Sequence, residues 1–423
     1  MKNIRKLFFK LVDALPRSIR GTIVRSQLYY KYENEVYGSI VYKIAETKDE
    51  LEQAFKIVQE AYEETNLLKD SYNGLRVTKY NLLPTTTVLI AKHGDEVVGT
   101  ISQIMDTQLG LPVDSIADIS HIRETGQRIS EVSSFAVKKK WRTKGKSLLL
   151  PLTTALIKYM YETIGSKYFV CVVNKKAKHF YEDLFGAYSL ELYKEEYDYV
   201  NCEPPIALYS DMSNLILDTF NHYLRVKSPL KSLHKMIHEP LWGKSLFLPQ
   251  NTFDMPTMSI YNKEVIRKFF SKNDKLLNSL NNKERAFLYN LYFTKENREI
   301  LKVSNISKNL TRINSRFYTS MNAFILHADR TIPTRCFEVS RHGVSILNVC
   351  NNSVGDKLKI SVDLNKEKLC VFNVCVAAIY NNRLILIISS KSPYMWSEYI
   401  HEIESRFYDL DSQDEVSGKI YSI

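Results

Sequence analysis

The sequence predicts an α/β domain with a mixed sheet, a helical connector and a small C-terminal β-barrel. Strand-like and helix-like segments alternate over residues 39–212, which is typical of α/β domains. Apolar residues at helical spacing, interrupted by prolines, fill residues 213–303. Short Val- and Ile-rich segments separated by Asn and Gly turns occupy residues 304–392, a pattern typical of small barrels. Residues 1–38 and 393–423 are expected to form a basic N-terminal segment and a C-terminal helix with a tail.

The elements of the first domain follow from the periodicity of its apolar residues. A strand at 39–47 and a helix at 48–66 come first, and the polar turn His93-Gly94-Asp95 joins two strands into a hairpin at 85–106. After the Pro- and Gly-bearing residues 109–126, the expected elements are a strand at 131–137, a helix at 148–164, a strand at 167–174, a helix at 176–185 and a strand at 188–193. This order predicts one mixed sheet covered by helices.

Length, composition and charge limit the class of protein. At 423 residues the chain exceeds the roughly 250 to 300 residues at which a single core stops growing, so more than one domain is expected. With 44% hydrophobic and 25% charged residues, the chain is not disordered. Its net charge of +11 favours acidic partners such as nucleic acid, anionic lipid, acyl carrier protein or nucleotides. Charge alone does not choose among them.

Neither a disulfide framework nor a metal centre is expected. The six cysteines include no C-x-x-C pair, and several lie in apolar runs, so they are expected to stay reduced and pack as small apolar side chains. His234 and His238 have i, i+4 spacing, but no third ligand accompanies them. Without an apolar run of about 18 residues or a secretory cleavage site, the chain is expected to be cytoplasmic and to lack a membrane span.

The first residues have the pattern of a basic amphipathic helix. Such a helix lies in anionic membrane interfaces, which would give residues 1–30 a peripheral contact with the inner membrane face, or it packs on the domain that follows. Both interpretations stay open. The apolar positions are Ile4, Leu7, Phe8, Leu11, Val12 and Leu15, and the charged ones are Lys2, Arg5, Lys6 and Lys10.

The most informative segment is a basic turn between a predicted strand and a predicted helix. From Val137 to Ser147 it reads V-K-K-K-W-R-T-K-G-K-S. A glycine-bearing turn before a helix directs backbone N–H groups and the positive end of the helix dipole at an anion. The cations around Gly145 therefore predict a strongly acidic ligand, such as the phosphate of a pantetheine carrier. The alternative is an ordinary turn with a solvated charge run at 138–140.

The spacing V-x-x-x-x-R-x-x-G-x-S resembles the acyl-donor motif of the GNAT superfamily of N-acyltransferases. Val137, Arg142, Gly145 and Ser147 carry it, with Ser147 in place of the usual Gly or Ala. Four further motifs, in order, resemble the N-acyl amino acid synthase family, which is related to the acyl-homoserine-lactone synthases. They are Leu83-Pro-Thr-Thr-Thr-Val-Leu-Ile-Ala91, Val97-Val-Gly-Thr-Ile101, Leu109-Gly-Leu-Pro-Val-Asp114 and Ile129-Ser-Glu-Val-Ser-Ser-Phe-Ala-Val137. The resemblance implies a GNAT-like fold over about residues 39–212.

The resemblance to the N-acyl amino acid synthase family also implies that an acyl-phosphopantetheine, on acyl carrier protein or coenzyme A, donates a fatty acyl group to the amine of an amino acid. This transfer needs a base for the ammonium proton, a donor for the tetrahedral oxyanion and an acid for the thiolate. Glu131 is the candidate base, with a solvated or ion-paired carboxylate as the alternative. Tyr181 is the candidate acid, with a core aromatic as the alternative. The predicted donor-binding residues are Phe135, Val137, Arg142, Lys144, Gly145, Lys146, Ser147 and Asn174.

Two further roles follow from this chemistry. If the strand splays from its neighbour, a backbone N–H between Phe135 and Val137 is the candidate oxyanion donor. An acceptor carboxylate needs a cation, for which four residues stand unranked: Arg76, Lys79, Arg123 and Arg128.

The second half carries a separate signal. Helical spacing extends from about Ile206 to Arg298, and barrel strands are expected at 339–348, 357–362, 369–380 and 384–389. The motifs Arg312-Ile-Asn-Ser-Arg316 and Glu338-Val-Ser-Arg-His-Gly343 resemble the R-x-x-x-R and [D/N]-x-S-x-x-G signature of the PilZ domain. The resemblance implies cyclic di-GMP as an effector, since guanidinium groups match phosphate oxygens and stack on bases. The implied ligand-binding residues are Arg312, Arg316, Glu338, Ser340 and Gly343, with Glu338 where Asp or Asn is usual.

These observations predict a bacterial N-acyltransferase under second-messenger control. Its predicted partners are acyl carrier protein, an amino acid and cyclic di-GMP, with no nucleic acid polymer and no metal. Two alternatives stay open. One is a non-catalytic cyclic di-GMP receptor that uses a degenerate acyltransferase fold, and the other is a homoserine-lactone-type signal synthase, which takes S-adenosylmethionine as its acceptor. In the PilZ-like barrel itself, a scaffold that binds no nucleotide is the alternative.

Overall fold

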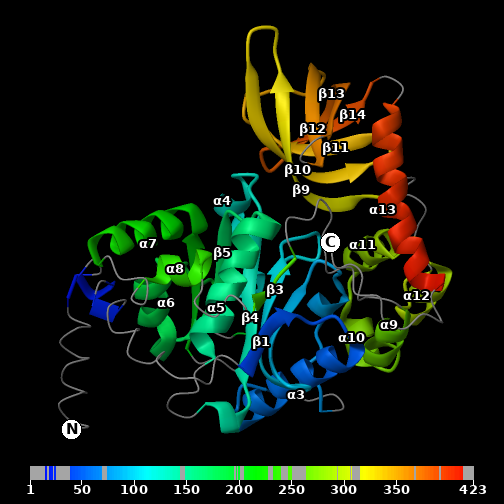
Figure 1. Cartoon of the computed structure of the whole chain (residues 1–423). Helices are drawn as coiled ribbons and strands as arrows, with labels where there is room; N and C mark the ends of the chain where they lie inside the picture. The colour runs from blue at the N-terminus through cyan, green and yellow to red at the C-terminus, as the bar shows by residue number, and fades with distance from the viewer. Residues whose placement is uncertain are drawn as a thin grey trace. The chain divides into compact units, whose positions relative to one another are not determined.

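The structure is a computed structural model (Figure 1), and the residues it describes form two compact units. One unit contains residues 1–80 and 86–251, and the other contains residues 81–85 and 252–423. The described residues are 15–16, 19–21, 23–24, 39–68, 74–142, 148–194, 197, 199–200, 204–226, 232–239, 246–249, 263–292, 294–304, 306, 315–365, 368–389 and 392–412. The basic helix predicted near the N-terminus falls on residues 1–14, outside this set. Within the set, no helix is long and apolar enough to cross a membrane.

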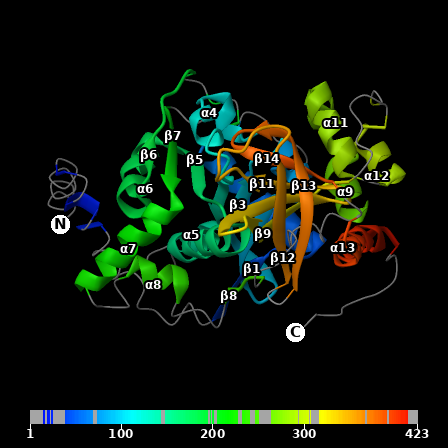
Figure 2. The same ribbon diagram turned by 90° about the horizontal axis from the view of Figure 1, so that it is seen from above.

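The first unit is built on a mixed sheet whose eight described strands have the order β6-β7-β5-β4-β3-β2-β1-β8. Two pairs of neighbours are parallel, β4 with β5 and β1 with β8. Figure 2 shows β5, β6 and β7 together at one edge. The strands are β1 (Ile40–Ile44), β2 (Thr87–His93), β3 (Glu96–Met105), β4 (Ile129–Val137), β5 (Tyr168–Asn174), β6 (Tyr188–Ser189), β7 (Pro205–Asp211) and β8 (Leu246–Phe247).

Helices connect and cover these strands. The α-helices are α3 (Lys48–Glu64), α4 (Ser120–Arg123), α5 (Leu149–Lys158), α6 (Lys178–Phe185), α7 (Met212–Val226) and α8 (Leu233–His238). The shorter helical elements are η3 (Lys79–Leu82), η4 (Pro112–Ser115), η5 (Lys139–Trp141), η6 (Tyr159–Ile164) and η7 (Lys175–Ala177).

Local sequence explains how the sheet is covered. Helix α3 begins after Thr47, whose side chain accepts a hydrogen bond from the Glu50 N–H at 3.2 Å, and acidic residues in its first turn suit the positive end of the helix. Helices α3 and α5 both pack on β3, where every residue after Glu96 is buried. A parallel β4–β5 pair needs a crossover, which α5 and η6 supply. The predicted α/β class is therefore confirmed.

Two elements of this unit differ from the prediction. The sequence pattern predicts helix from about Ile206, but residues 205–211 form strand β7, which pairs with β5 along its whole length. A short apolar run does not distinguish strand from helix by its periodicity, so tertiary pairing decides the outcome. The strand expected at 188–193 is also shorter, since β6 contains only Tyr188 and Ser189.

The second unit contains four described helices before a closed barrel. The barrel order is β10-β11-β14-β13-β12-β9, and β11 and β14 lie side by side in both views (Figures 1 and 2). The helices are α9 (Lys263–Phe270), α10 (Asp274–Ser279), α11 (Asn282–Leu291) and α12 (Lys295–Ile300), with α13 (Tyr394–Ser412) after the barrel. The strands are β9 (Phe317–Leu326), β10 (Thr331–Ser340), β11 (Gly343–Leu347), β12 (Lys357–Asn365), β13 (Lys368–Tyr380) and β14 (Arg383–Ile388).

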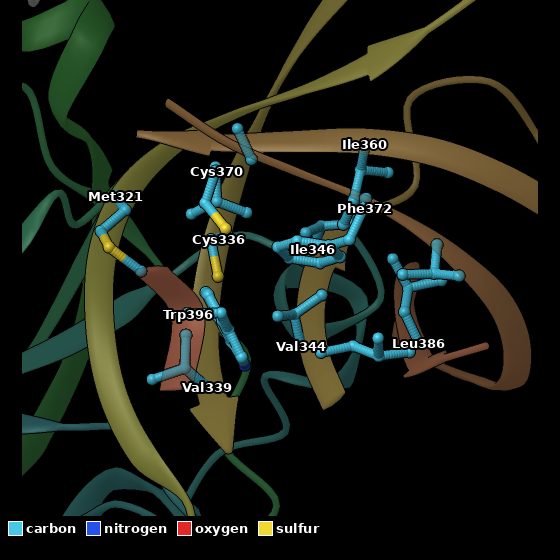
Figure 3. Close-up of a cluster of buried hydrophobic side chains, with 14 of the residues drawn as sticks. Met321, Cys336, Val339, Val344, Ile346, Ile360, Cys370, Phe372, Leu386 and Trp396 are labelled. Carbon is cyan, nitrogen blue, oxygen red and sulfur yellow. The ribbon is translucent and has the colours of Figure 1, made fainter. Parts of the chain in front are cut away.

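Figure 3 shows the apolar side chains that fill the barrel. Trp396 of α13 joins this core, fully buried, with its ring centroid 5.0 Å from that of Phe372. Its indole Nε1 donates to the Ser340 carbonyl at 3.1 Å. The C-terminal helix is therefore part of the barrel's fold, and the predicted β-barrel is confirmed.

The hairpin between β10 and β11 corrects one predicted strand. The sequence predicts a single strand at 339–348, but β10 ends at Ser340 and β11 begins at Gly343. Glycine is required at this turn because a Cβ at position 343 would lie 2.7 Å from the Leu386 carbonyl oxygen. Strand β9 and most of β10 were not among the predicted strands, since Thr, Ser, Asn and Arg dilute their apolar pattern.

Candidate functional site

The carboxylate of Glu131 lies inside the first unit, and the residue is only 1% exposed. The Val113 N–H donates to its Oε2 at 2.8 Å, and the Tyr197 hydroxyl hydrogen-bonds the same carboxylate. Burial raises the pKa of Glu131 well above its ordinary value, and the negative charges of Asp114 and Asp106 raise it further. A buried carboxyl group with a raised pKa is a candidate for proton transfer.

An ion-pair network holds the loop that donates to this carboxylate. Arg123 lies 2.8 Å from Asp106 and 2.7 Å from Asp114. The Leu111 N–H donates to the Asp114 carboxylate at 2.8 Å, which fixes η4 and with it the Val113 N–H. Arg123 therefore acts within the scaffold, although the sequence offered it as a cation for an acceptor.

Strands β4 and β5 separate after three paired residues. Their ladder joins Ile129–Glu131 to Tyr168–Val170, although β4 continues to Val137. A bulge interrupts the pairing of β4 with β3, and Ser134 within it has a φ of 53°. The separation leaves Phe135 partly exposed. The splay needed by the expected oxyanion donor is present, while the donor itself stays a prediction.

The basic turn is described only as far as Arg142. The Arg142 Nε donates to the Val137 carbonyl at 2.6 Å, and its Nη1 lies 2.6 Å from a Glu64 oxygen. Arg142 thus ties the end of β4 to α3. Four predicted donor-binding residues, Lys144, Gly145, Lys146 and Ser147, lie outside the described residues.

Part of the lysine run is neutralised by acidic side chains. Lys138 and Lys140 lie 2.8 Å and 2.7 Å from the two oxygens of Glu96, and their hydrogen bonds lower the pKa of that carboxyl. These contacts are exposed, so their contribution to stability is small. The described charge at this turn is therefore less free than the sequence alone suggests.

Tyr181 and Asn174 occupy neighbouring elements. The Tyr181 ring lies 5.5 Å from Phe180 and 5.8 Å from Phe185, centroid to centroid. Burial raises the pKa of its phenol, although the residue keeps some accessible surface. An acid role and an aromatic packing role both remain compatible with this position. Asn174 ends β5, and its Oδ1 accepts from the Ala177 N–H at 3.1 Å as the cap of η7.

The structure adds three tyrosines that the sequence analysis does not single out. Tyr197, which contacts the candidate base, lies 5.8 Å from Tyr199, and Tyr199 lies 5.9 Å from Tyr80 between ring centroids. Arg76 stacks over Tyr199 at 4.8 Å, and Lys79 lies 5.3 Å from the Tyr80 ring. The closely spaced tyrosines of the 193–199 segment were the available signal, but nothing in the sequence linked them to β4.

The four candidate cations can now be separated. Arg76 and Lys79 belong to the tyrosine cluster that reaches the candidate base. Arg128 is 3% exposed, and its Nη1 donates to the Ile164 carbonyl at 2.5 Å. Arg123 is held by two aspartates. Arg76 also has a protein partner, because its Nη2 donates to the Tyr199 carbonyl at 2.5 Å, so Arg76 and Lys79 differ from the other two only in lying beside the tyrosine cluster.

In the barrel, the predicted nucleotide-binding residues form two contacting pairs. Arg316 Nη1 lies 3.4 Å from Glu338 Oε2, and the Ser340 hydroxyl donates to the Gly343 carbonyl at 3.2 Å. Arg312 lies outside the described residues. The described part of the signature therefore gathers at the start of β9 and at the β10–β11 hairpin.

A small, partly open pocket with room for about one water molecule lies beside the Arg316–Glu338 pair. Helix α11 lines it with Phe287, Asn290 and Leu291, and β9 adds Phe317 and Tyr318. A pocket of this size does not by itself hold a nucleotide base, since small-molecule sites typically measure roughly 300 to 1,000 Å³.

The histidine pair forms a small cluster in the first unit. The rings of His234 and His238 lie 4.6 Å apart, and His238 Nδ1 is 2.9 Å from Glu162 Oε1. Among the described residues, no group of three His, Cys, Asp or Glu side chains is arranged to hold a metal.

Comparison with known proteins places this geometry in context. Residues 53–210 match the family model described as N-acyl amino acid synthase FeeM. The predicted resemblance is confirmed, and the matched residues include β4, the Val113 loop and the tyrosine cluster of Tyr80, Tyr197 and Tyr199. No match was found among curated proteins.

Solved structures with similar folds accompany the FeeM match. FeeM itself, an N-acyl amino acid synthase from uncultured soil microbes, is 25% identical, with a TM-score of 0.36 over 44% of this chain and 97% of that chain. The CoA-dependent acyl-homoserine lactone synthase BjaI is 17% identical, with a TM-score of 0.36 over 50% of this chain and 95% of that chain. The PilZ domain of YcgR from Escherichia coli is 17% identical, with a TM-score of 0.20 over 25% of this chain and 98% of that chain.

Proposed function

We propose that this protein transfers a fatty acyl group from the thioester of acyl carrier protein or coenzyme A to the amine of an amino acid. The observation that carries the proposal is a buried Glu131 with a raised pKa beside a splayed strand, within residues that match the FeeM family. The described residues include a candidate base, a splayed strand and nearby cations. The basic turn before α5 is the proposed phosphate contact of the donor.

In the proposed reaction, the amine nitrogen attacks the thioester carbonyl carbon, and the C–S bond breaks. Glu131 takes the proton that the amine loses, directly or through the Tyr197 hydroxyl. The Val113 N–H holds one carboxylate oxygen, so the other can face the amine. Backbone N–H groups of the bulged part of β4 stabilise the oxyanion. Tyr181 returns a proton to the leaving thiolate.

The donor contacts in this proposal come from two places. Phe135, Val137 and Asn174 lie on the separated parts of β4 and β5, and the phosphate contacts are proposed to be Arg142, Lys144, Gly145, Lys146 and Ser147 of the basic turn. Arg76 and Lys79 bind the acceptor carboxylate from the tyrosine cluster. A suitable test is thioester consumption with a panel of amino acids, comparing the wild-type protein with Glu131→Gln. Consumption that needs no amine, or is equally fast in both proteins, contradicts the proposal.

A second proposed activity is regulation by cyclic di-GMP at the barrel. Support comes from Arg316, Glu338, Ser340 and Gly343, which gather at the start of β9 and at the β10–β11 hairpin. The Glu338 carboxylate is already paired with the Arg316 guanidinium, so a phosphate of the nucleotide must displace it to bind Arg316. Isothermal titration with cyclic di-GMP tests this proposal. If no heat of binding is detected at micromolar nucleotide, the barrel serves only as a scaffold.

Two alternatives have direct tests. A homoserine-lactone-type synthase would require S-adenosylmethionine in place of an amino acid. A non-catalytic receptor would bind cyclic di-GMP without consuming any thioester. We also propose a cytoplasmic location with peripheral contact at the inner membrane face through residues 1–30, which deletion of that segment and cell fractionation would test.

A further inference from the structure

A short piece of the chain links the two units. Residues 81–85 follow Tyr80 in sequence but belong to the compact unit that contains the barrel. Within that unit, the Tyr292 hydroxyl donates to the Leu82 carbonyl at 2.6 Å. Leu82 and Leu83 are fully buried, and Tyr292 is 5% exposed. This segment, residues 81–85, is therefore anchored to the end of α11.

The residues on both sides of this segment belong to the candidate active site. Arg76, Lys79 and Tyr80 of the acceptor-side cluster precede it. On its other side, β2 begins at Thr87, which pairs with Gln103 of β3. Gln103 in turn pairs with Val132, the neighbour of the candidate base. A shift of segment 81–85 would thus reach the acceptor side through the chain itself.

Helix α11 has the features of a rigid rod. A capping box between Asn281 and Glu284 closes its first turn. The Arg285 side chain donates to the Leu277 and Leu280 carbonyls at 2.6 Å and 3.0 Å. At the other end, the Arg298 Nε donates to the Tyr292 carbonyl at 2.7 Å. A helix fixed at both ends transmits displacement along its length.

The same helix lines the barrel pocket. Phe287, Asn290 and Leu291 face it, beside the Arg316–Glu338 pair. The pocket contacts and the Leu82 contact therefore lie within two turns of one helix, about 8 Å along its axis. A ligand that separates Arg316 from Glu338 must repack against α11.

We propose that Tyr292 is a positioning residue for the acceptor side of the active site, and that α11 couples the barrel pocket to segment 81–85. This inference rests on the acyltransferase function proposed above, and it names acceptor binding as the regulated step. The donor side depends on β4 and the basic turn, so donor binding stays unchanged.

The test compares Tyr292→Phe with Tyr289→Phe, which removes a hydroxyl from the same helix but leaves the Leu82 contact intact. In Tyr292→Phe the KM for the amino acid is expected to rise about three- to tenfold, the effect of one lost hydrogen bond, with the donor KM unchanged. Equal acceptor KM values in the two variants would overturn the positioning role. A parallel rise in the donor KM would also overturn it, because it indicates general damage.

Coupling to the pocket is tested with Glu338→Gln in a double-mutant cycle. If the two sites are independent, the acceptor KM change in Glu338→Gln/Tyr292→Phe equals the product of the changes in the two single variants, which contradicts the coupling. A departure of threefold or more from that product supports the coupling. If no amino acid is acylated, hydrogen exchange decides instead. Faster exchange at residues 81–92 in Tyr292→Phe, with unchanged barrel strands, supports the anchor, and unchanged exchange overturns it. If cyclic di-GMP does not bind the wild-type protein, the proposed effector is withdrawn, but the acceptor KM and hydrogen-exchange measurements still test the positioning role of Tyr292.

Discussion

Glu131 in the first unit and Arg316 in the second are the central ionisable groups of the two proposed sites, and their surroundings differ in kind. Glu131 is buried, and its described contacts are a backbone N–H and a phenol. Arg316 keeps more than a third of its side chain exposed and already pairs with a carboxylate. A carboxyl group held away from water is reactive before substrate arrives, whereas a satisfied guanidinium must give up a partner before it binds a ligand.

The largest expected effect comes from removing the buried carboxyl group of Glu131. Glu131→Gln keeps the shape of the side chain but removes the proton acceptor, so kcat is expected to fall by about 10²- to 10⁴-fold with little change in the donor KM. Steady-state kinetics with acyl carrier protein as donor measure this. Glu191→Gln, an exposed residue of the same unit, serves as the control and should retain the wild-type rate.

The next effect tests how Glu131 is oriented. Arg123→Gln removes both ion pairs that hold the Val113 loop, and the rate is expected to fall about tenfold or more. Arg123→Lys should recover part of the rate, because a lysine can still neutralise one aspartate. A full wild-type rate in Arg123→Gln would show that the loop needs no such support.

The third effect sharpens the comparison at the barrel. Glu338→Asn releases Arg316 from its carboxylate, and affinity for cyclic di-GMP is expected to rise about three- to tenfold. Isothermal titration measures the change, with Glu398→Gln on α13 as the control. Weaker binding in Glu338→Asn would mean that Glu338 itself contacts the nucleotide.

The smallest effect concerns stability. Because the pKa of Glu131 is higher in the folded state than in the unfolded chain, the folded state binds the proton more tightly. Stability contributed by this group is present below the unfolded pKa of about 4.3 and falls by about 1.4 kcal/mol per pH unit until the folded pKa is reached. In thermal melts, the melting temperature of Glu131→Gln should increase relative to that of the wild-type protein as pH rises through this window. A constant difference at all pH values contradicts the raised pKa.

The sequence predicts elements best where one local signal dominates. Helix α3, the hairpin of β2 and β3, and strands β12 to β14 all follow from apolar periodicity and turn residues. Strand β7 does not, because its pairing with β5 outweighs an ambiguous local pattern. The division of 339–348 into two strands depends on the close approach of Gly343 to Leu386, which involves a distant strand.

The candidate site shows the same limit. Motif spacing identified Glu131, but its partner Val113 comes from a loop 18 residues earlier, and Tyr197 lies 66 residues later in the chain. The preference for Arg76 and Lys79 over Arg123 and Arg128 depends on which cations lie beside the tyrosine cluster. Such contacts between distant segments leave no pattern in a single sequence.

The central claim is that the first unit acylates an amine with a carrier-bound fatty acid. Mass spectrometry of a reaction containing purified protein, a long-chain acyl carrier protein and the twenty amino acids tests it most directly. The account predicts an N-acyl amino acid that disappears in Glu131→Gln. An intact thioester, or a product formed only after S-adenosylmethionine is added, would contradict it.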